Sequence, residues 1–505
     1  MNNSICSHEQ PHSLHFHIEP SGKKNMTEDR TASSCLSQFE ELLQKTTLGR
    51  YKVKNAESIR SAQQQVFILT LHAVAQEKDC KDLLQEIEPS GVGNRLIDAC
   101  NRSNGRLVLR IWQGGARWWN LNSNGKDACL LLANAEVAGY RLARKAFDLY
   151  YKSYQKGHPL DFPRICIPEV LLFERGGGGS NNPWAIFSYV KDMNVISEET
   201  IRVVQNWQVC DDFIHDMVKV RKEFGFDEPH PRHGRVCVEH ALEYAAHLLE
   251  DAIIPMHTIF FDVENNAAKE PSLREEIRDL NTNNFRRSGI AIKYLDMVKL
   301  YQEQTCQIIA ERSSDCQNQS DRMGVFIAAI EGFIEKLLLE ANTVDAFPLP
   351  SVLCHLDLQP QNMILCKSKS NNITSTTVPR VASILDWEES CYADPRFELL
   401  LVCRKIVANR KQADAIWDSY STYVNDLFHF NVGPIDPWLR LESVHNLLGF
   451  CMQGMGLLEG GRNPWEEKSD LLNKIHREMQ RLQIDLGWSK DEAAGIDSSN
   501  DLRSA

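Results

Sequence analysis

The sequence lacks the features that mark proteins of membranes and of the cell exterior. No uninterrupted apolar stretch reaches the roughly 18 residues needed to span a bilayer, and no apolar signal segment follows the N-terminus. The 15 cysteines include no Cys-x-x-Cys pair and no regular spacing, which argues against a disulfide framework. We therefore expect a soluble, cytoplasmic protein with no membrane partner and with reduced, mostly buried thiols.

An excess of basic residues is also missing. The chain carries 56 Lys+Arg against 68 Asp+Glu, a formal net charge of −12. Binding to a phosphate backbone needs clustered Lys and Arg, so nucleic acid is excluded as the main partner. The charge is uneven, because residues 1–190 balance to +4 and residues 191–505 to −16. This division suggests that the two parts handle different ligands.

Length and patterning predict two lobes between polar ends. The 505 residues, 43% hydrophobic and 25% charged, are typical of a globular protein with several folded units or one large bilobal unit. We expect a disordered tail at 1–35, an N-lobe at 36–190, a helical C-lobe at 191–488 and a second disordered tail at 489–505.

Periodicity predicts the elements within these lobes. The N-lobe is expected to hold a helix at 61–76, strands joined by turns over 86–112, a long helix at 126–151 and strands at 165–174 and 184–190. The C-lobe is expected to be helical at 236–254, 290–311, 324–341, 396–428, 436–458 and 465–486, with strands at 363–366 and 380–385 and a surface loop at 262–288.

Four glycines at 176–179 form the most conspicuous glycine run. No helix and no Lys-Ser/Thr pair follow them, so a Walker-type phosphate loop is excluded. A flexible hairpin connection is the better interpretation.

The most informative segment is VLCHLDLQPQNMIL at 352–365, followed by VASILDWEES at 381–390. Asp357 is expected on a tight loop, where its carboxylate can accept a proton from a hydroxyl. Asn362 offers an amide oxygen and Asp386 a carboxylate, and both are hard oxygen ligands suited to Mg²⁺. The segment therefore predicts a catalytic carboxylate beside a magnesium site.

Upstream of it lies a short glycine-containing sequence that we interpret as a hairpin loop. Ser90, Gly91, Gly93 and Asn94 are small enough for backbone N–H groups to approach phosphate oxygens. Alone, such a sequence is more often an ordinary turn.

Three further features follow in the order that a phosphoryl-transfer site needs. Arg110 is a cation on an expected third strand, and Glu136 is a carboxylate on the next helix, suited to hold that cation. The strand at 185–190 leads to a hinge where backbone groups near Ser188 and Val190 would meet an adenine ring.

With these residues in place, the chain resembles the aminoglycoside phosphotransferase and choline-kinase-like family, small-molecule relatives of the protein kinases. The resemblance covers about 85–460, is strongest over 352–400, and implies an α+β, bilobal protein-kinase-like fold with a small antiparallel sheet and a larger helical lobe. Its motif, H-x-D-x-x-x-x-N followed by an apolar residue and D-W-E and then A-D-P, is matched by His355, Asp357, Asn362, Asp386, Trp387, Glu388, Asp394 and Pro395.

The resemblance also implies roles. It makes Asp357 the catalytic base, Asn362 and Asp386 the Mg²⁺ ligands, and Arg110 the contact to the α- and β-phosphates of ATP while paired to Glu136. His355 would brace the catalytic loop. Arg110 stands where Lys is common, as in some members, and Glu398 stands where Asp is common, which puts its bracing role in doubt.

Three functions remain open at this point. The first is an ATP- and Mg²⁺-dependent kinase acting on a hydroxyl of a small molecule, with an amine-bearing acceptor favoured by the acidic C-lobe. The second is a protein kinase, against which Asp386 is followed by Trp-Glu and no Ala-Pro-Glu motif closes an activation segment. The third is a non-catalytic nucleotide-binding protein. The sequence does not identify the acceptor or the oligomeric state.

Overall fold

The computed structural model describes thirteen stretches of the chain, and every structural statement below concerns them alone. They are residues 26–46, 51–60, 64–73, 91–112, 125–153, 164–176, 182–190, 242–283, 293–315, 321–358, 362–366, 380–405 and 410–454.

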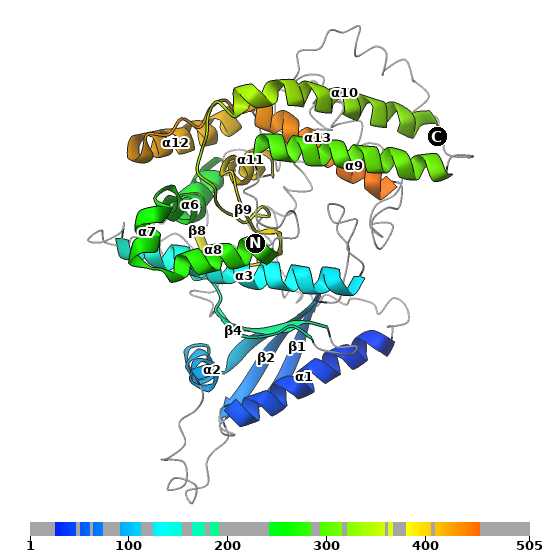
Figure 1. Cartoon of the computed structure of the whole chain (residues 1–505). Helices are drawn as coiled ribbons and strands as arrows, with labels where there is room; N and C mark the ends of the chain where they lie inside the picture. Colours follow the sequence, from blue (N-terminus) through cyan, green and yellow to red (C-terminus); the bar gives the residue numbers. More distant parts are fainter. Residues whose placement is uncertain are drawn as a thin grey trace, which may run out of the picture.

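The N-lobe contains a five-stranded antiparallel sheet (Figure 1). Its strands, in the spatial order β1-β2-β3-β5-β4, are β1 Tyr51–Arg60, β2 Gln64–Ala73, β3 Arg106–Trp112, β5 Trp184–Ser188 and β4 Val170–Glu174. Successive side chains of a strand point to opposite faces. In β3, Leu107 and Leu109 therefore join the core on one face, whereas Trp112 joins the core on the other. By the same alternation, Arg110 shares the face of Trp112.

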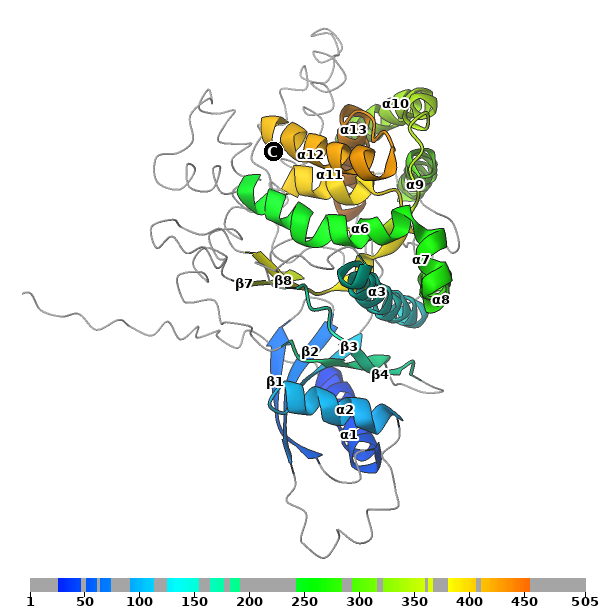
Figure 2. The same cartoon turned by 90° about the vertical axis from the view of Figure 1, so that its left-hand side faces the viewer.

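Helices cover both faces of this sheet. The helices α1 (Met26–Thr46) and α2 (Gly91–Arg102) pack on the outer face, as Figure 2 shows. The inner face carries α3 (Gly125–Ser153), which lies between the sheet and the helical lobe in both views. Because α3 contacts β3 and β4 on one side and α6 and α8 on the other, it joins the two lobes.

The C-lobe is mostly helical, with two small two-stranded antiparallel sheets facing the N-lobe. The strands β6 (Val352–Cys354) and β9 (Cys391–Ala393) form one sheet, and the hairpin of β7 (Met363–Cys366) and β8 (Arg380–Ile384) forms the other. A short 3-10 helix, η4 (Trp387–Glu389), follows β8. The described helices are the π-helix η2 Leu249–Ile253, α6 Ile254–Phe261, α7 Val263–Lys269, α8 Ser272–Asn283, α9 Tyr294–Asp315, α10 Asp321–Val344, α11 Arg396–Lys405, α12 Arg410–Phe428 and α13 Asp436–Gly454.

The architecture confirms the expected α+β, bilobal kinase-like fold and many of its elements. The long helix, the two strands after it, the hairpin strands at 363–366 and 380–384 and most C-lobe helices lie where the patterns indicate. The helix expected at 465–486 and the tail at 489–505 lie outside the described residues. None of the described helices combines the length and the apolar character needed to cross a bilayer.

Four of the elements expected from the sequence pattern were wrong. The segment 61–76 contains the strand β2, not a helix, because its apolar run pairs with β1 and β3. The segment expected as a strand and loop near 90–94 forms the start of α2. Helix α1 begins at Met26, inside the expected tail, because Cys35, Phe39 and Leu43 bury one face of it against the sheet.

The fourth correction concerns the expected surface loop at 262–288, most of which forms α7 and α8. In α8, Leu273 and Leu280 are fully buried and Ile277 packs partly beside them. Their spacing places them on one helix face, against α3.

Candidate active site between the two lobes

Arg110 lies at the centre of a buried cluster of carboxylates. Its Nη1 atom is 2.5 Å from Oε1 of Glu136, and its Nη2 atom is 2.6 Å from Oδ1 of Asp386 and 4.0 Å from Oε2 of Glu388. Burial alone would lower the pKa of Arg110, but the charges of Glu136 and Asp386 outweigh this and raise it. The expected pair of Arg110 and Glu136 is therefore present, and Arg110 also links α3 to the segment after β8.

Two aromatic residues hold this cluster in place. Trp112, two residues after Arg110 on the same face of β3, donates its indole N–H to Oε2 of Glu136 at 2.8 Å. Tyr140, one helical turn after Glu136, accepts the backbone N–H of Asp386 at 2.9 Å. Burial raises the pKa of the Tyr140 phenol, and the Glu136 charge raises it further, so this group stays protonated.

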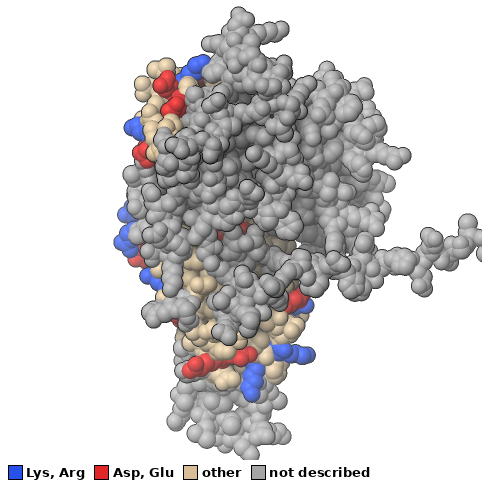
Figure 3. Space-filling view, turned by 90° about the vertical axis from the view of Figure 1, so that its right-hand side faces the viewer, with Lys and Arg blue, Asp and Glu red and all other residues tan. Residues whose placement is uncertain are grey.

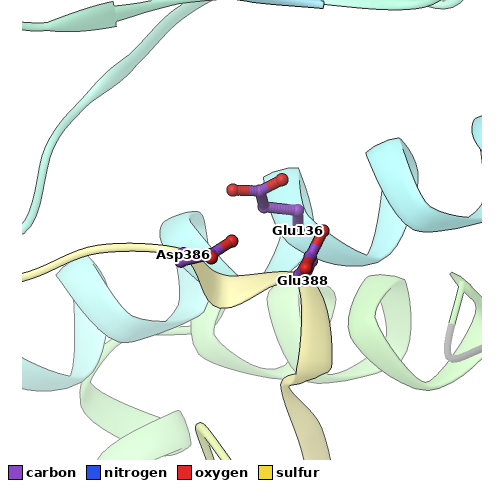
Figure 4. Close-up of side chains that lie close together, drawn as sticks. All are labelled: Glu136, Asp386 and Glu388. Atoms are coloured by element: carbon purple, nitrogen blue, oxygen red, sulfur yellow. The ribbon is translucent and has the colours of Figure 1, made fainter. Parts of the chain in front are cut away.

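Figure 4 shows the three carboxylates of the cluster, Glu136 from α3 and Asp386 and Glu388 from the segment that follows β8. Their oxygen atoms lie within 4.8 Å of one another, close enough to hold a metal ion. Arg110 already provides a positive charge to all three. We therefore interpret this cluster as an ion-pair network that positions Asp386.

The loop expected to be catalytic, called the catalytic loop below, follows β6. Asp357 is partly buried, and its Oδ2 atom accepts a hydrogen bond from Nδ2 of Asn362 at 2.7 Å. The backbone N–H of Asp357 donates to Nδ1 of His355 at 3.1 Å. Since Nδ1 is an acceptor, Nε2 carries the proton that His355 donates to the Leu385 carbonyl at 2.8 Å. His355 thus braces the loop as a neutral imidazole.

Glu398, from the first turn of α11, provides a second brace. Its Oε2 atom accepts the backbone N–H of His355 and, at 3.0 Å, that of Leu356. The side chain is fully buried, so no solvent competes for these amides. The replacement of the more common Asp by Glu therefore retains the bracing role that the sequence left in doubt.

Asn362 and Asp386 are brought together by the hairpin of β7 and β8. Met363 pairs with Ile384, and the N–H of Leu385 donates to the Asn362 carbonyl at 2.8 Å. The amide nitrogen of Asn362 is engaged with Asp357, so its side-chain oxygen is the atom it can offer to a cation. An amide oxygen beside a carboxylate fits the oxygen preference of Mg²⁺.

The expected glycine loop is not part of this site. Gly91, Gly93 and Asn94 lie in α2, and Ser90 lies outside the described residues. Helix α2 packs on the outer face of the sheet, whereas Arg110 points to the inner face. The first hairpin of the sheet is instead formed by β1 and β2, whose connection at 61–63 is outside the described residues.

The expected hinge follows β5. Ser188 ends that strand, and both its N–H and its hydroxyl bond to the backbone of Glu169, at 2.9 Å and 2.8 Å. Val190, partly exposed, is the last described residue before 242. Ser188 is therefore tied within the N-lobe, and a role for Val190 in adenine binding stays a prediction.

Sequence reasoning missed the second layer of this site. It gave Trp387 no role beyond its place in the motif, and that side chain is fully buried, with its ring centroid 4.6 Å from that of His355. It assigned no role to Tyr140. The available signal was its position, because Tyr140 lies four residues after Glu136 on the same helix face.

A comparison with protein families matches the part of the chain that contains the Asp357 loop and Asp386. A family model described as "Phosphotransferase enzyme family" matches residues 276–429, less than a third of the chain but including the catalytic loop, Asp386 and Glu398. This match confirms the resemblance expected from the motif. No curated protein matches the chain by sequence.

Several solved structures are similar in arrangement at low identity. Wild-type aminoglycoside 2'-phosphotransferase-IIIa in its GDP complex is 12% identical, with 90% of this chain and 98% of that chain covered and a TM-score of 0.43. Ethanolamine kinase from Plasmodium vivax is 10% identical, with 92% of each chain covered and a TM-score of 0.43. Macrolide 2'-phosphotransferase from Brachybacterium faecium is 13% identical, with 86% and 100% covered and a TM-score of 0.40.

Proposed function

From the resemblance of residues 276–429 to the phosphotransferase enzyme family, we propose that this chain is an ATP-dependent kinase of small molecules. It transfers the γ-phosphoryl group of ATP to a hydroxyl of its acceptor. The observation that carries the proposal is the hydrogen bond between Asp357 and Asn362. The loop that holds them is braced by His355 and Glu398. The β7–β8 hairpin joins the end of this loop to Asp386.

The chain's own residues would act mainly by positioning and by electrostatics, as in other phosphoryl transfers. Asn362 holds Oδ2 of Asp357, and we assign the other oxygen, Oδ1, to the proton of the acceptor hydroxyl. Asn362 and Asp386 would bind Mg²⁺, which neutralises phosphate charge when present. Arg110, held by Glu136, would contact the α- and β-phosphates at the inner face of the sheet.

The segment after Asp386 supports a small acceptor. It continues directly into η4, β9 and then α11, which begins at Arg396. A protein kinase would need an extended activation segment here as a platform for a peptide. The close succession of these elements favours the small-molecule hypothesis over the protein-kinase one.

An amine-bearing acceptor was expected from the charge of the C-lobe. On the face in Figure 3, the acidic and basic side chains of the described residues are intermixed along the same edge. This arrangement gives no added support to long-range steering of a cation. We therefore propose a hydroxylated acceptor, and the experiment below tests whether it also carries an amine.

Phosphoryl transfer from MgATP to a panel of hydroxylated metabolites, with and without amines, tests the proposal. The Asp357→Asn variant should lose transfer at least 10²-fold, in the range expected for a general base. Asp426→Asn, an exposed carboxylate on α12, is the matched control and should keep full activity. Equal ATP consumption by the wild type and Asp357→Asn would contradict the proposal and favour the non-catalytic, nucleotide-binding alternative.

A further inference from the structure

A cavity in the C-lobe begins one residue from the proposed base. It encloses about 440 Å³ of empty space, part of it open to solvent, and lies among α9, α11, α13 and the catalytic loop. Residues that line it include Met297, Tyr301, Leu356, Phe397, Leu441 and His445.

Leu356 connects this cavity to the catalytic loop. It lies between the brace His355 and the base Asp357, and it adopts a left-handed backbone conformation with φ of +63°. That conformation is uncommon for a residue with a large side chain and persists only where the surroundings hold it. Glu398 holds the Leu356 amide, and the Leu356 side chain lines the cavity. The cavity therefore adjoins the loop that carries the proposed base.

The lining determines what such a ligand can be. Most of its lining residues are apolar, and among the described residues its polar side chains are Tyr301, His445 and Glu442. Two of these already bond to each other, because the Tyr301 hydroxyl is 2.7 Å from Nδ1 of His445. Leucine, methionine and phenylalanine side chains cannot replace the hydrogen bonds that a sugar makes with water. Away from Tyr301, His445 and Glu442, a polyhydroxylated molecule would lose those bonds, whereas an apolar one would not.

We propose that this cavity receives the apolar body of the phosphoryl acceptor, so that the acceptor is a small alcohol with an apolar portion and not a sugar. That the ligand is a phosphoryl acceptor rests on the proposed kinase function. The cavity's preference for apolar alcohols does not depend on it and is measured separately.

Two probes with the same skeleton test this preference. Cyclohexylmethanol and glucose each carry a six-membered ring and a primary alcohol, but glucose adds ring hydroxyls. Their binding to the full chain is measured by calorimetry without nucleotide. We expect the dissociation constant of cyclohexylmethanol to be at least tenfold lower than that of glucose.

Variants then locate the binding. Met297→Trp should fill the cavity and weaken cyclohexylmethanol binding at least tenfold. Leu401→Ser, at a partly exposed lining position, makes the wall polar with less risk to folding and should also weaken it. Leu339→Ala, which removes an 81% exposed side chain on α10, is the matched control. Circular dichroism melting verifies that each variant is folded.

The outcomes separate this inference from the proposed function. Glucose binding as tightly as cyclohexylmethanol, or cyclohexylmethanol binding unchanged in folded Met297→Trp and Leu401→Ser, would overturn the cavity inference even if ATP is consumed. Absence of MgATP binding and transfer alongside selective cyclohexylmethanol binding would overturn the kinase proposal alone. Transfer to cyclohexylmethanol that both cavity variants reduce would support both.

Discussion

Arg110 is the residue on which the two lobes depend most directly, because it pairs with carboxylates from α3 and from the segment after β8. Its side chain is only 11% exposed, and that of Glu136 is fully buried. A buried carboxylate that loses its partner keeps the full cost of removal from water. The planar guanidinium also reaches two partners at once, which a lysine ammonium on a single stem does less well.

We therefore expect Arg110→Met to lower the free energy of unfolding by about 3–5 kcal/mol, as for other broken buried pairs. Adding Glu136→Met to this variant should lower the free energy of unfolding by much less than Glu136→Met does alone, because it removes the carboxylate that Arg110→Met left unpaired. Urea denaturation of both single variants and the double variant measures this coupling. Additive losses would show that the pair contributes no interaction energy.

Glu398 makes a comparable prediction for the catalytic loop. Glu398→Ala would leave the His355 and Leu356 amides buried without an acceptor, at about 1–3 kcal/mol for each group. Both the free energy of unfolding and the transfer rate should fall. Glu335→Ala, at an exposed position on α10, should leave both unchanged. A Glu398→Ala variant as stable and active as the wild type would remove the brace from the mechanism.

His257 gives the stability a defined pH dependence. It is fully buried on α6, its Nδ1 atom is 2.7 Å from the Tyr420 hydroxyl, and burial lowers its pKa to about 3. The unfolded chain binds this proton near pH 6.5, so stability falls as the pH drops from 6.5 toward 3. The loss is about 1.4 kcal/mol per pH unit, or about 2 kcal/mol at pH 5.

Removing this imidazole should flatten the dependence. His257→Phe gives up the bond to Tyr420, so it should be less stable at pH 7, yet lose less stability than the wild type between pH 6.5 and 4.5. Urea denaturation at several pH values compares the two slopes. Parallel slopes would show that another group dominates the acid sensitivity.

At the scale of elements, the close contact between α3 and η4 sets how near the segment after β8, which carries Asp386 and Glu388, lies to α3. A Cβ atom on Gly139 would lie 3.0 Å from Cβ of Trp387 and would clash with the Ser390 hydroxyl. Only glycine allows this approach, and Tyr140 then reaches the Asp386 amide. The glycine thus lets α3 position a proposed metal ligand.

Gly139→Ala should therefore shift the segment 387–390, lower the melting temperature and reduce transfer. The chain offers a matched control in Gly332→Ala on α10, where an added Cβ meets nothing within 4 Å. That change should raise stability by up to about 1 kcal/mol through helix propensity. Thermal melts and transfer assays of both variants check the contrast, which equal effects would contradict.

The elements also show which parts of the fold the sequence could predict. The long helix α3 follows a single clear helical period, and β8 is a short run whose five residues are all buried. In β2, the run Val-Phe-Ile-Leu-Thr-Leu fits both a helix and a strand, and only pairing with β1 and β3 decides between them. In α2, two glycines concealed the helical spacing of Leu96, Ala99 and Cys100.

The residues of the site also divide into those that the sequence could indicate and those that it could not. Asp357, Asn362 and Asp386 could be proposed from the sequence because they match one motif, whose loop and hairpin lie close together along the chain. Trp112 and Tyr140 could not, because their partners Glu136 and Asp386 come from other elements. The assignment of Gly91 and Gly93 to a phosphate loop failed because the sheet face of α2 depends on tertiary packing.

At the scale of the whole molecule, the proposed nucleotide site belongs to neither lobe alone. Arg110 comes from the sheet, and Asn362 and Asp386 flank one hairpin of the C-lobe, with α3 between the two lobes. A ligand that contacts both lobes binds the folded chain and not the unfolded one. Its binding therefore adds to the free energy of unfolding by RT ln(1 + [L]/Kd), about 2.7 kcal/mol at 100 times Kd.

We expect MgATP to raise the melting temperature of the full chain and expect a chelator to remove most of that rise. Asp386→Asn keeps the backbone N–H that donates to Tyr140 but loses the ionised carboxylate, so it should respond weakly to MgATP while ATP with chelator affects it and the wild type alike. Asp426→Asn is the control and should respond as the wild type does. Equal stabilisation by ATP with and without Mg²⁺ would argue against metal ligation by Asn362 and Asp386. Nucleotide binding would then not depend on the metal, and the non-catalytic hypothesis would become the better one.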